Sequence, residues 1–163
     1  MSIKNNEEQN GNDNALLVEN FLAAKRVEGC SDKSMHYYKS TLHNAIHKIG
    51  KSVRHITTDD LRNYLNEYQQ TSGATKITVD NIRRILSSFF SWLEDEDYIM
   101  KSPVRRIHKV KVGKTVKDTY TDEALEQMRD YCDGIRDLAL IDLLASTGMR
   151  VGELVKLNRN DID

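Results

Sequence analysis

Residues 75–93 read TKITVDNIRRILSSFFSWL. The apolar residues of this stretch recur every three or four positions, the period of one face of an α-helix. They are Val79, Ile82, Leu86, Phe89, Phe90 and Leu93. We therefore expect a long helix that begins at Thr75, turns this face toward a core, and packs Trp92 beside it.

Three shorter helices are expected upstream, because polar capping residues and glycines bracket apolar stripes of the same period. The expected bounds are Ala15 to about Val27 before Gly29, Ser31 to Gly50, and Thr57 or Thr58 to Gly73. The inward residues are Leu17, Phe21, Leu22 and Ala24, then Met35, Tyr38, Leu42, Ala45, Ile46 and Ile49, then Leu61, Tyr64, Leu65 and Tyr68. Four helices joined by short turns predict a compact bundle. The Asn- and Glu-rich residues 1–14 predict a disordered tail before it.

The composition supports an all-α fold. One proline and eight glycines among 163 residues are too few for the turns of an all-β protein. Cys30 and Cys132 lack the spacing of a zinc site or a disulfide framework, and no apolar stretch is long enough to cross a membrane. We expect a cytoplasmic protein with no membrane association, no metal and no cofactor.

The charge of the chain is unevenly distributed, although its net value is only −1. Residues 1–100 hold twelve Lys or Arg against fourteen acidic residues, and residues 118–163 hold five against eleven. Residues 101–117 carry seven basic residues and no acidic one. This basic segment follows the bundle, contains Pro103 and has no strong apolar periodicity, so we expect a linker on the surface that tracks phosphates.

A second unit is expected after the basic segment. Thr121 caps a helix that carries Leu125, Met128 and Cys132, and after Gly134 the stretch 138–145 is apolar on nearly every side. A helix of that kind belongs in a domain core, yet few residues remain to cover it. We therefore expect the chain to stop inside a domain, with residues 158–163 approaching a strand.

The most informative motif is residues 143–154, LLASTGMRVGEL, which end an apolar helix at Gly148 and then present Arg150. It resembles the tyrosine recombinase, or phage integrase, family, in which Thr-Gly-(Leu or Met)-Arg-x-(Gly or Ser)-Glu-Leu carries the first catalytic arginine. Leu157 and the closing Asp-Ile-Asp of residues 161–163 complete the pattern. The layout of residues 15–163 also resembles that family, from the four helices to Ser102-Pro103-Val104 and Tyr120-Thr121-Asp122-Glu123.

The resemblance implies a domain organisation. Residues 15–100 would form the core-binding, SAM-like helical domain, residues 101–119 the basic linker, and residues 120–163 the truncated start of the catalytic domain. The expected fold class is therefore all-α, a four-helix core-binding bundle followed by a helical fragment of an α+β catalytic domain. The implied partners are double-stranded DNA and further recombinase subunits assembled on it.

The resemblance also implies a chemistry without metal, in which a tyrosine attacks a DNA phosphate and forms a phosphotyrosyl link that a DNA hydroxyl later resolves. Arg150 would touch the scissile phosphate, because a planar guanidinium can donate to two of its oxygens at once, and Glu153 would support it. The lysine, the His-x-x-Arg box and the nucleophilic tyrosine of the family would lie beyond Asp163. We therefore expect no strand cleavage by this chain alone.

DNA contacts are expected from the second and fourth helices, which meet DNA in the family, and from the basic segment. Polar groups at helix starts can bind phosphates, and Arg or Asn further along can read base edges. The candidates are Lys33, Ser34, His36, Tyr37, Lys39, Ser40 and His43, then Thr75, Lys76, Thr78, Asn81, Arg83 and Arg84, then Arg105, Arg106, Lys109, Lys111 and Lys114.

Several alternatives stay open. Arg150 could be a surface residue paired with Glu153, and the polar helix faces could be merely solvated. His43 and His47 have the spacing of a zinc protease motif but lack its glutamate, which disfavours a metal site. The chain could also be a naturally short, non-catalytic DNA-binding protein, or a helical protein-interaction module that touches no DNA.

Overall fold

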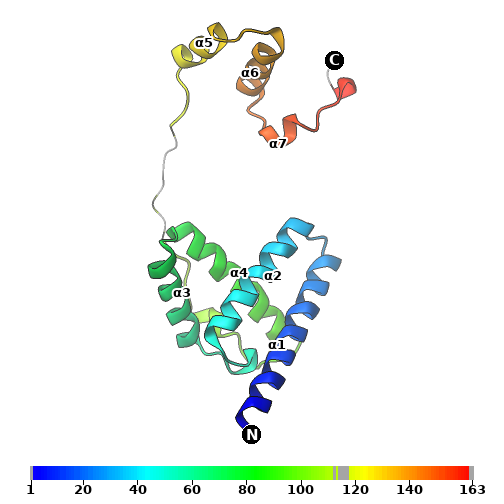
Figure 1. Cartoon of the computed structure of the whole chain (residues 1–163), viewed down its shortest axis with the longest axis vertical. Coiled ribbons are helices and arrows are strands. Elements are labelled where there is room, and N and C mark those ends of the chain that lie inside the picture. The colour runs from blue at the N-terminus through cyan, green and yellow to red at the C-terminus, as the bar shows by residue number, and fades with distance from the viewer. Residues whose placement is uncertain (1, 112, 114–117, 162–163) are drawn as a thin grey trace. The chain divides into compact units, whose positions relative to one another are not determined.

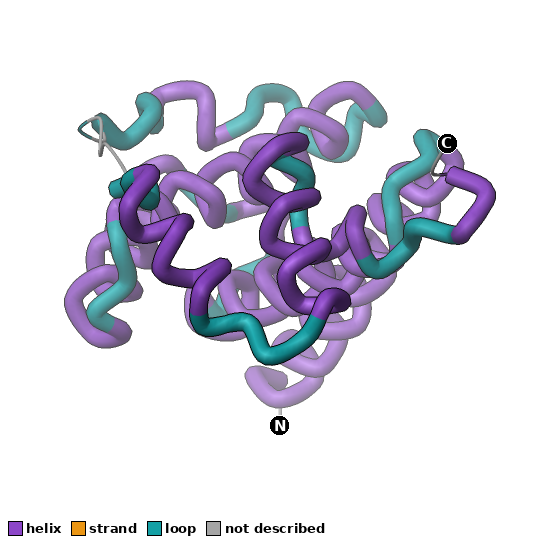
Figure 2. Tube along the Cα trace, turned by 90° about the horizontal axis from the view of Figure 1, so that it is seen from above, coloured by secondary structure: helices purple, strands orange, loops and turns teal. Residues whose placement is uncertain are grey.

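The computed structural model describes residues 2–111, 113 and 118–161, and their side chains apart from those of residues 2–10 and 12. It divides into two units, Met1–Gly113 and Lys114–Asp163, and each is considered by itself (Figure 1). The described residues form helices, turns and loops without a strand (Figure 2), so the prediction of an all-α fold is confirmed.

Four helices and two short 3-10 helices make up the first unit. They are α1 (Ser2–Val27), α2 (Asp32–Ile49), η1 (Val53–His55), α3 (Thr58–Ser72), α4 (Lys76–Asp95) and η2 (Pro103–Arg106). In α2, α3 and α4 the capping side chains are Ser31, Thr57 and Thr75, each of which accepts a hydrogen bond from a backbone N–H three residues later. The helix ends therefore lie where the capping signals predicted them, with Thr57 rather than Thr58 as the cap of α3.

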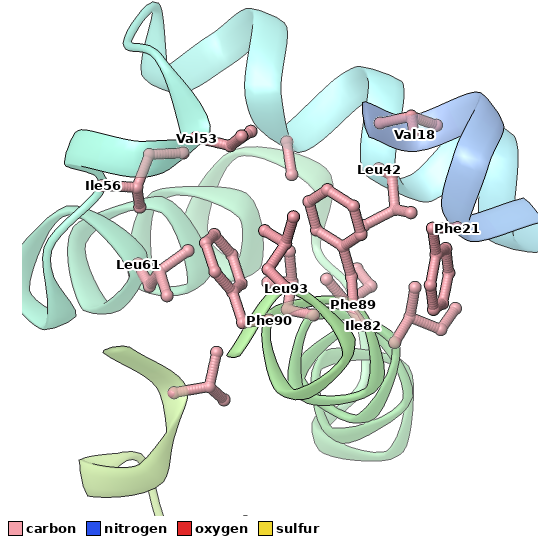
Figure 3. Packing of buried hydrophobic residues seen from close by; sticks show 14 of the residues in the cluster. Val18, Phe21, Leu42, Val53, Ile56, Leu61, Ile82, Phe89, Phe90 and Leu93 are labelled. Carbon is pink, nitrogen blue, oxygen red and sulfur yellow. The ribbon is translucent and has the colours of Figure 1, made fainter. Parts of the chain in front are cut away.

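The hydrophobic core lies around α4, which packs against α1, α2 and α3. All six apolar residues of its expected inward face are buried, and Trp92 is partly buried beside them. Phe89 meets Phe21 of α1 edge-on, with ring centroids 5.3 Å apart, and Phe90 lies on the side of Leu61 from α3 (Figure 3). The prediction of a four-helix bundle built on this stripe is confirmed.

The expectation of a disordered tail over residues 1–14 is wrong for residues 2–14, which are helical. Helix α1 begins at Ser2 instead of near Ala15. Asn14 is buried, and its side chain bonds both the carbonyl oxygen of Lys51 and the N–H of Val53. These two bonds extend the packed part of α1 beyond the apolar stripe from which the sequence prediction was made.

The expected surface linker is also partly wrong, because its first half packs on the bundle. The side chain of Val104 in η2 is only 3% exposed, and Ile107 and Val110 pack partly buried against the core. These three apolar side chains lie among the cations at every third position, a pattern too short to predict the packing from the sequence.

The second unit contains α5 (Asp122–Asp130), α6 (Ile135–Thr147), α7 (Val151–Leu154) and η3 (Arg159–Asp161). Arg129 of α5 joins the helices through Asp142 of α6, with Nε and Oδ1 2.7 Å apart. None of its described residues is buried, including the apolar ones of α6 that were expected in a core. Residues 159–161 form a 3-10 turn rather than the approach to a strand, because Asp161 bonds back to the N–H of Asn158.

Across the described residues, we find no helix that combines the length and the apolar character needed to span a membrane.

Candidate nucleic-acid interface

The N-terminal half of α4 presents exposed polar and basic side chains on one side of a buried stripe. Lys76, Asn81 and Arg84 are exposed, whereas Thr75 and Thr78 are engaged with each other at the helix cap. Lys76 and Arg84 lie four residues before and after Asp80, so the three positions share one face of the helix.

Asp80 is a buried carboxylate at the centre of that face, with 8% of its surface exposed. Its Oδ1 atom accepts hydrogen bonds from Nε of Arg83 at 2.8 Å and from the backbone N–H of Val110 at 3.1 Å. The bond from Arg83 is the main cause that holds the pKa of Asp80 below its ordinary value, and Val110 and the charge of Lys109 act in the same direction. Asp80 therefore stays ionised in the folded chain and joins the basic segment to α4.

The position of Arg83 corrects one predicted contact. Its side chain is only 14% exposed and is engaged with Asp80, so it is not a free cation for a phosphate. The neighbouring Arg84 is exposed, because it lies about 100° further round the helix.

Polar bonds fix the basic segment to α3 and α4 at further points. Thr58 donates its hydroxyl to the carbonyl oxygen of Pro103 at 2.7 Å, and Arg62 donates to that of Arg106 at 3.2 Å. Glu94 accepts from the backbone N–H of Ser102 and pairs with Arg105, with atoms 2.9 Å apart in each case. The main chain from 102 to 110 is thus held along its length, while the side chains of Arg106, Lys109 and Lys111 are exposed.

The side chains of α2 that were predicted to contact DNA differ in whether they already bond to neighbours within the bundle. Lys33, His36, Tyr37 and His43 are exposed. The other three have neighbours within the bundle: Ser34 bonds Ser31, Ser40 donates to the carbonyl oxygen of Tyr37, and Lys39 pairs with Glu19 of α1 at 2.7 Å. Lys33, His36, Tyr37 and His43 are thus the α2 candidates whose side chains make no hydrogen bond or ion pair within the described structure.

His43 and His47 lie in parallel on one side of α2, with ring centroids 6.4 Å apart. They line a hollow of about 440 Å³ between α1 and α2, whose other walls include Val18, Ile46 and Lys51. Within the described residues no three potential metal ligands come together, here or elsewhere. The geometry supplies no third ligand to these two imidazoles.

Arg150 precedes α7 in the second unit, and its side chain is 85% exposed. Glu153 accepts a hydrogen bond from the backbone N–H of Arg150 at 2.8 Å and another from its guanidinium at 3.2 Å. One carboxylate therefore caps the helix start and also holds the arginine. Arg150 and Glu153 thus form the surface ion pair that was the alternative to a phosphate-binding role, but this pair leaves other N–H donors of the guanidinium free for an oxyanion.

The structure thus brings together two of the three predicted groups in the first unit, on α4 and on the basic segment. Arg150 belongs to the other unit, and Lys114 lies outside the described residues. Sequence reasoning missed Asp80, Thr58, Arg62 and Glu94, which fix the basic segment. A single signal was present: Asp80 is an acid directly beside the apolar stripe, flanked by Val79 and near Ile82.

Comparison with protein families matches residues 17–100 to the phage integrase, N-terminal SAM-like domain. The tyrosine recombinase XerC of Thermodesulfovibrio yellowstonii is 30% identical over 154 residues, covering 91% of this chain and 51% of the relative. The XerC of Bacillus subtilis is 32% identical over 109 residues, covering 64% of this chain and 36% of the relative. The chain therefore spans about half the length of the curated relatives it matches.

Solved structures show the same fold at lower identity. A lambda integrase in a tetramer bound to a Holliday junction matches with a TM-score of 0.74 and 20% identity, over 91% of this chain and 44% of that one. A lambda integrase in a dimer bound to a COC′ core site matches with a TM-score of 0.72 and 21% identity, over 91% and 43%.

Proposed function

Because the chain belongs to the phage integrase family of tyrosine recombinases, we propose that it binds double-stranded DNA and takes part in site-specific recombination. Family membership confirms the resemblance that the motif around Arg150 indicated. The observation that carries the proposal is the docked basic segment, which holds Arg106, Lys109 and Lys111 exposed beside α4.

The supporting physics is electrostatic. Cations that bind phosphates release the counterions of the DNA backbone. Because the main chain that carries these cations is already docked on the bundle, binding costs less conformational entropy than it would for a free segment. Lys76 and Arg84 of α4 and the exposed Lys33, His36, Tyr37 and His43 of α2 would add further contacts. Fixed cations position a protein on DNA, and Asn81 and Arg84 are the side chains of α4 suited to reading base edges.

We propose that recombination proceeds by strand exchange through a phosphotyrosyl intermediate. This chain would contribute Arg150, which would contact the scissile phosphate. An exposed guanidinium held by Glu153 is suited to a phosphate whose non-bridging oxygens gain charge. The dimeric and tetrameric DNA complexes of lambda integrase support assembly of several subunits on DNA, which we propose for this chain as well. We place this activity in the cytoplasm.

The experiment is a salt series of duplex DNA binding by fluorescence anisotropy. Replacing Lys109 and Lys111 with Gln is expected to weaken binding and flatten the slope of log K against log salt by about 1.8, because each lost phosphate contact lowers it by about 0.9. The control replaces Lys25 and Lys48, which pair with Glu28 and Glu67, and should leave the slope unchanged.

Two alternatives are separated by the same experiment and one more. Absence of any complex at low salt would refute DNA binding and favour a helical protein-interaction module. Both remaining hypotheses expect this chain alone to bind recombination sites without strand exchange, so the gene separates them: a stop codon directly after Asp163 would favour the naturally short, non-catalytic DNA-binding protein, and a reading frame that continues would favour the recombinase.

A further inference from the structure

The contact between Asp80 and Val110 joins parts of the chain 30 residues apart. The carboxylate lies on α4. The N–H that donates to it belongs to Val110 of the basic segment, between Lys109 and Lys111. A buried carboxylate is costly unless it is bonded, and here one oxygen receives both the guanidinium of Arg83 and this N–H. The bond therefore gives Val110 a fixed place on the helix.

The consequence for charge follows from helix geometry. Lys76 and Arg84 lie about 6 Å before and after Asp80 along the axis of α4, on the same face. Lys109 and Lys111 flank Val110, whose N–H is bonded to Asp80. Their side chains therefore start close to Asp80, which lies midway between Lys76 and Arg84 on the helix. Four exposed basic side chains are thus collected from two segments around one buried acid.

We propose that Asp80 is a positioning residue that docks the basic segment on α4, so that Lys109 and Lys111 form one phosphate-binding surface with Lys76 and Arg84. This inference rests on the proposed DNA binding and adds to it a mechanism: an acid inside a basic surface strengthens binding of a polyanion.

Two substitutions separate this role from a plain charge effect. Asp80→Asn and Asp80→Ala both remove a negative charge, which by itself favours a polyanion. Asn retains Oδ1, the atom that accepts from Val110 and Arg83, whereas Ala loses it. Positioning therefore predicts weaker DNA binding by Asp80→Ala than by Asp80→Asn, whereas charge alone predicts equal binding by the two variants.

The first measurement is hydrogen exchange of the Val110 amide in the free chain, which needs no DNA. We expect exchange at least about tenfold faster in Asp80→Ala than in the unaltered chain, and near-normal protection in Asp80→Asn. Circular dichroism and the protection of the α4 core amides check that both variants fold. Equal protection of Val110 in all three chains would overturn the docking.

The second measurement is duplex binding of the same three chains in a salt series. Asp80→Asn should bind as tightly as the unaltered chain or more tightly, and Asp80→Ala roughly threefold to tenfold more weakly than Asp80→Asn. Replacing Lys109 and Lys111 with Gln should then flatten the salt slope less in Asp80→Ala than in Asp80→Asn.

The outcomes distinguish this inference from the proposed function. If all three chains bind DNA and the lysine replacements act equally in each, DNA binding stands and the positioning role of Asp80 is overturned. If none binds DNA while Val110 loses protection only in Asp80→Ala, the proposed function fails and Asp80 is left as a purely structural anchor, which also overturns the inference.

Discussion

The side-chain oxygen of Asn14 accepts a hydrogen bond from the backbone N–H of Val53 at 2.8 Å. The side-chain nitrogen of the same residue donates to the carbonyl oxygen of Lys51 at 3.0 Å. One amide thus satisfies the carbonyl of Lys51, which lies between α2 and η1, and the N–H of Val53, the first residue of η1, which is 1% exposed. Helix α1 is joined to the rest of the bundle through a polar contact as well as through its apolar stripe.

Replacing Asn14 with Ala is expected to lower the free energy of unfolding by about 1–3 kcal/mol, because the N–H of the buried Val53 loses its partner. Urea denaturation monitored by circular dichroism measures it. Asn20→Ala is the matched control, since Asn20 lies exposed on the same helix. Equal stability of the two variants would show that the N–H of Val53 finds water instead.

Asp60 makes the stability of the first unit depend on pH. Its carboxylate accepts hydrogen bonds from Lys51 and from the backbone and hydroxyl of Thr57, which together lower its pKa from 3.8 to about 2. A folded pKa below the unfolded one means that the stabilisation is complete above about pH 4 and disappears as the pH falls toward 2. After allowance for solvent screening, we expect the ionised Asp60 to contribute about 1–2 kcal/mol to the free energy of unfolding.

The measurement compares unfolding free energies at pH 7 and pH 2.5 for the unaltered chain and for Asp60→Asn. The drop between the two pH values should be smaller in the variant by that amount. Asp59→Asn is the control, because the side chain of Asp59 is 82% exposed and pairs only with Arg62 in the described structure. A drop of the same size in all three proteins would contradict the assignment.

The helices were predictable because their signals are local. Ser31, Thr57 and Thr75 cap residues that follow them directly, and the stripe of α4 needs only a periodicity to be read. The αL conformations of Gly50 and Gly73, with φ of 67° and 63°, are likewise local ends of helices. Such features depend on neighbours within one turn, so composition and spacing are sufficient to place them.

The long-range contacts of the bundle and of the candidate interface were not predictable in the same way. The hydrogen-bond partners of Asn14 lie 37 and 39 residues further along the sequence, and Val110, which bonds Asp80, lies 30 residues further along. A tertiary hydrogen bond leaves no periodic mark in the sequence. For the same reason the seven cations of the basic segment led us to predict a phosphate partner, which stays a prediction, but they could not show that the segment is docked.

Arg83 and Arg84 are adjacent, but we expect their replacement by Gln to have different effects. Arg83→Gln removes the main partner of the buried Asp80 and should lower the unfolding free energy by about 1–3 kcal/mol. Arg84→Gln, at an exposed position, should leave stability within about 0.5 kcal/mol and weaken duplex binding at low salt. Denaturation and anisotropy on the same two proteins test this, and a reversed pattern would remove Arg84 from the interface.

Ser102 offers a substitution that should stabilise the chain. It is 3% exposed, and its hydroxyl oxygen has no hydrogen-bond partner among the described residues, although its backbone N–H donates to Glu94. Ser102→Ala removes the unpaired hydroxyl and keeps the backbone bond, and the extended backbone before Pro103, with φ −64° and ψ 122°, suits Ala equally well. We therefore expect the unfolding free energy to rise by up to about 1 kcal/mol, since burying an unpaired hydroxyl is unfavourable. Thermal and urea denaturation measure the change. A loss of stability in Ser102→Ala would mean that an ordered water bonds this hydroxyl, in which case η2 is held on the bundle by one more polar contact than the protein atoms alone provide.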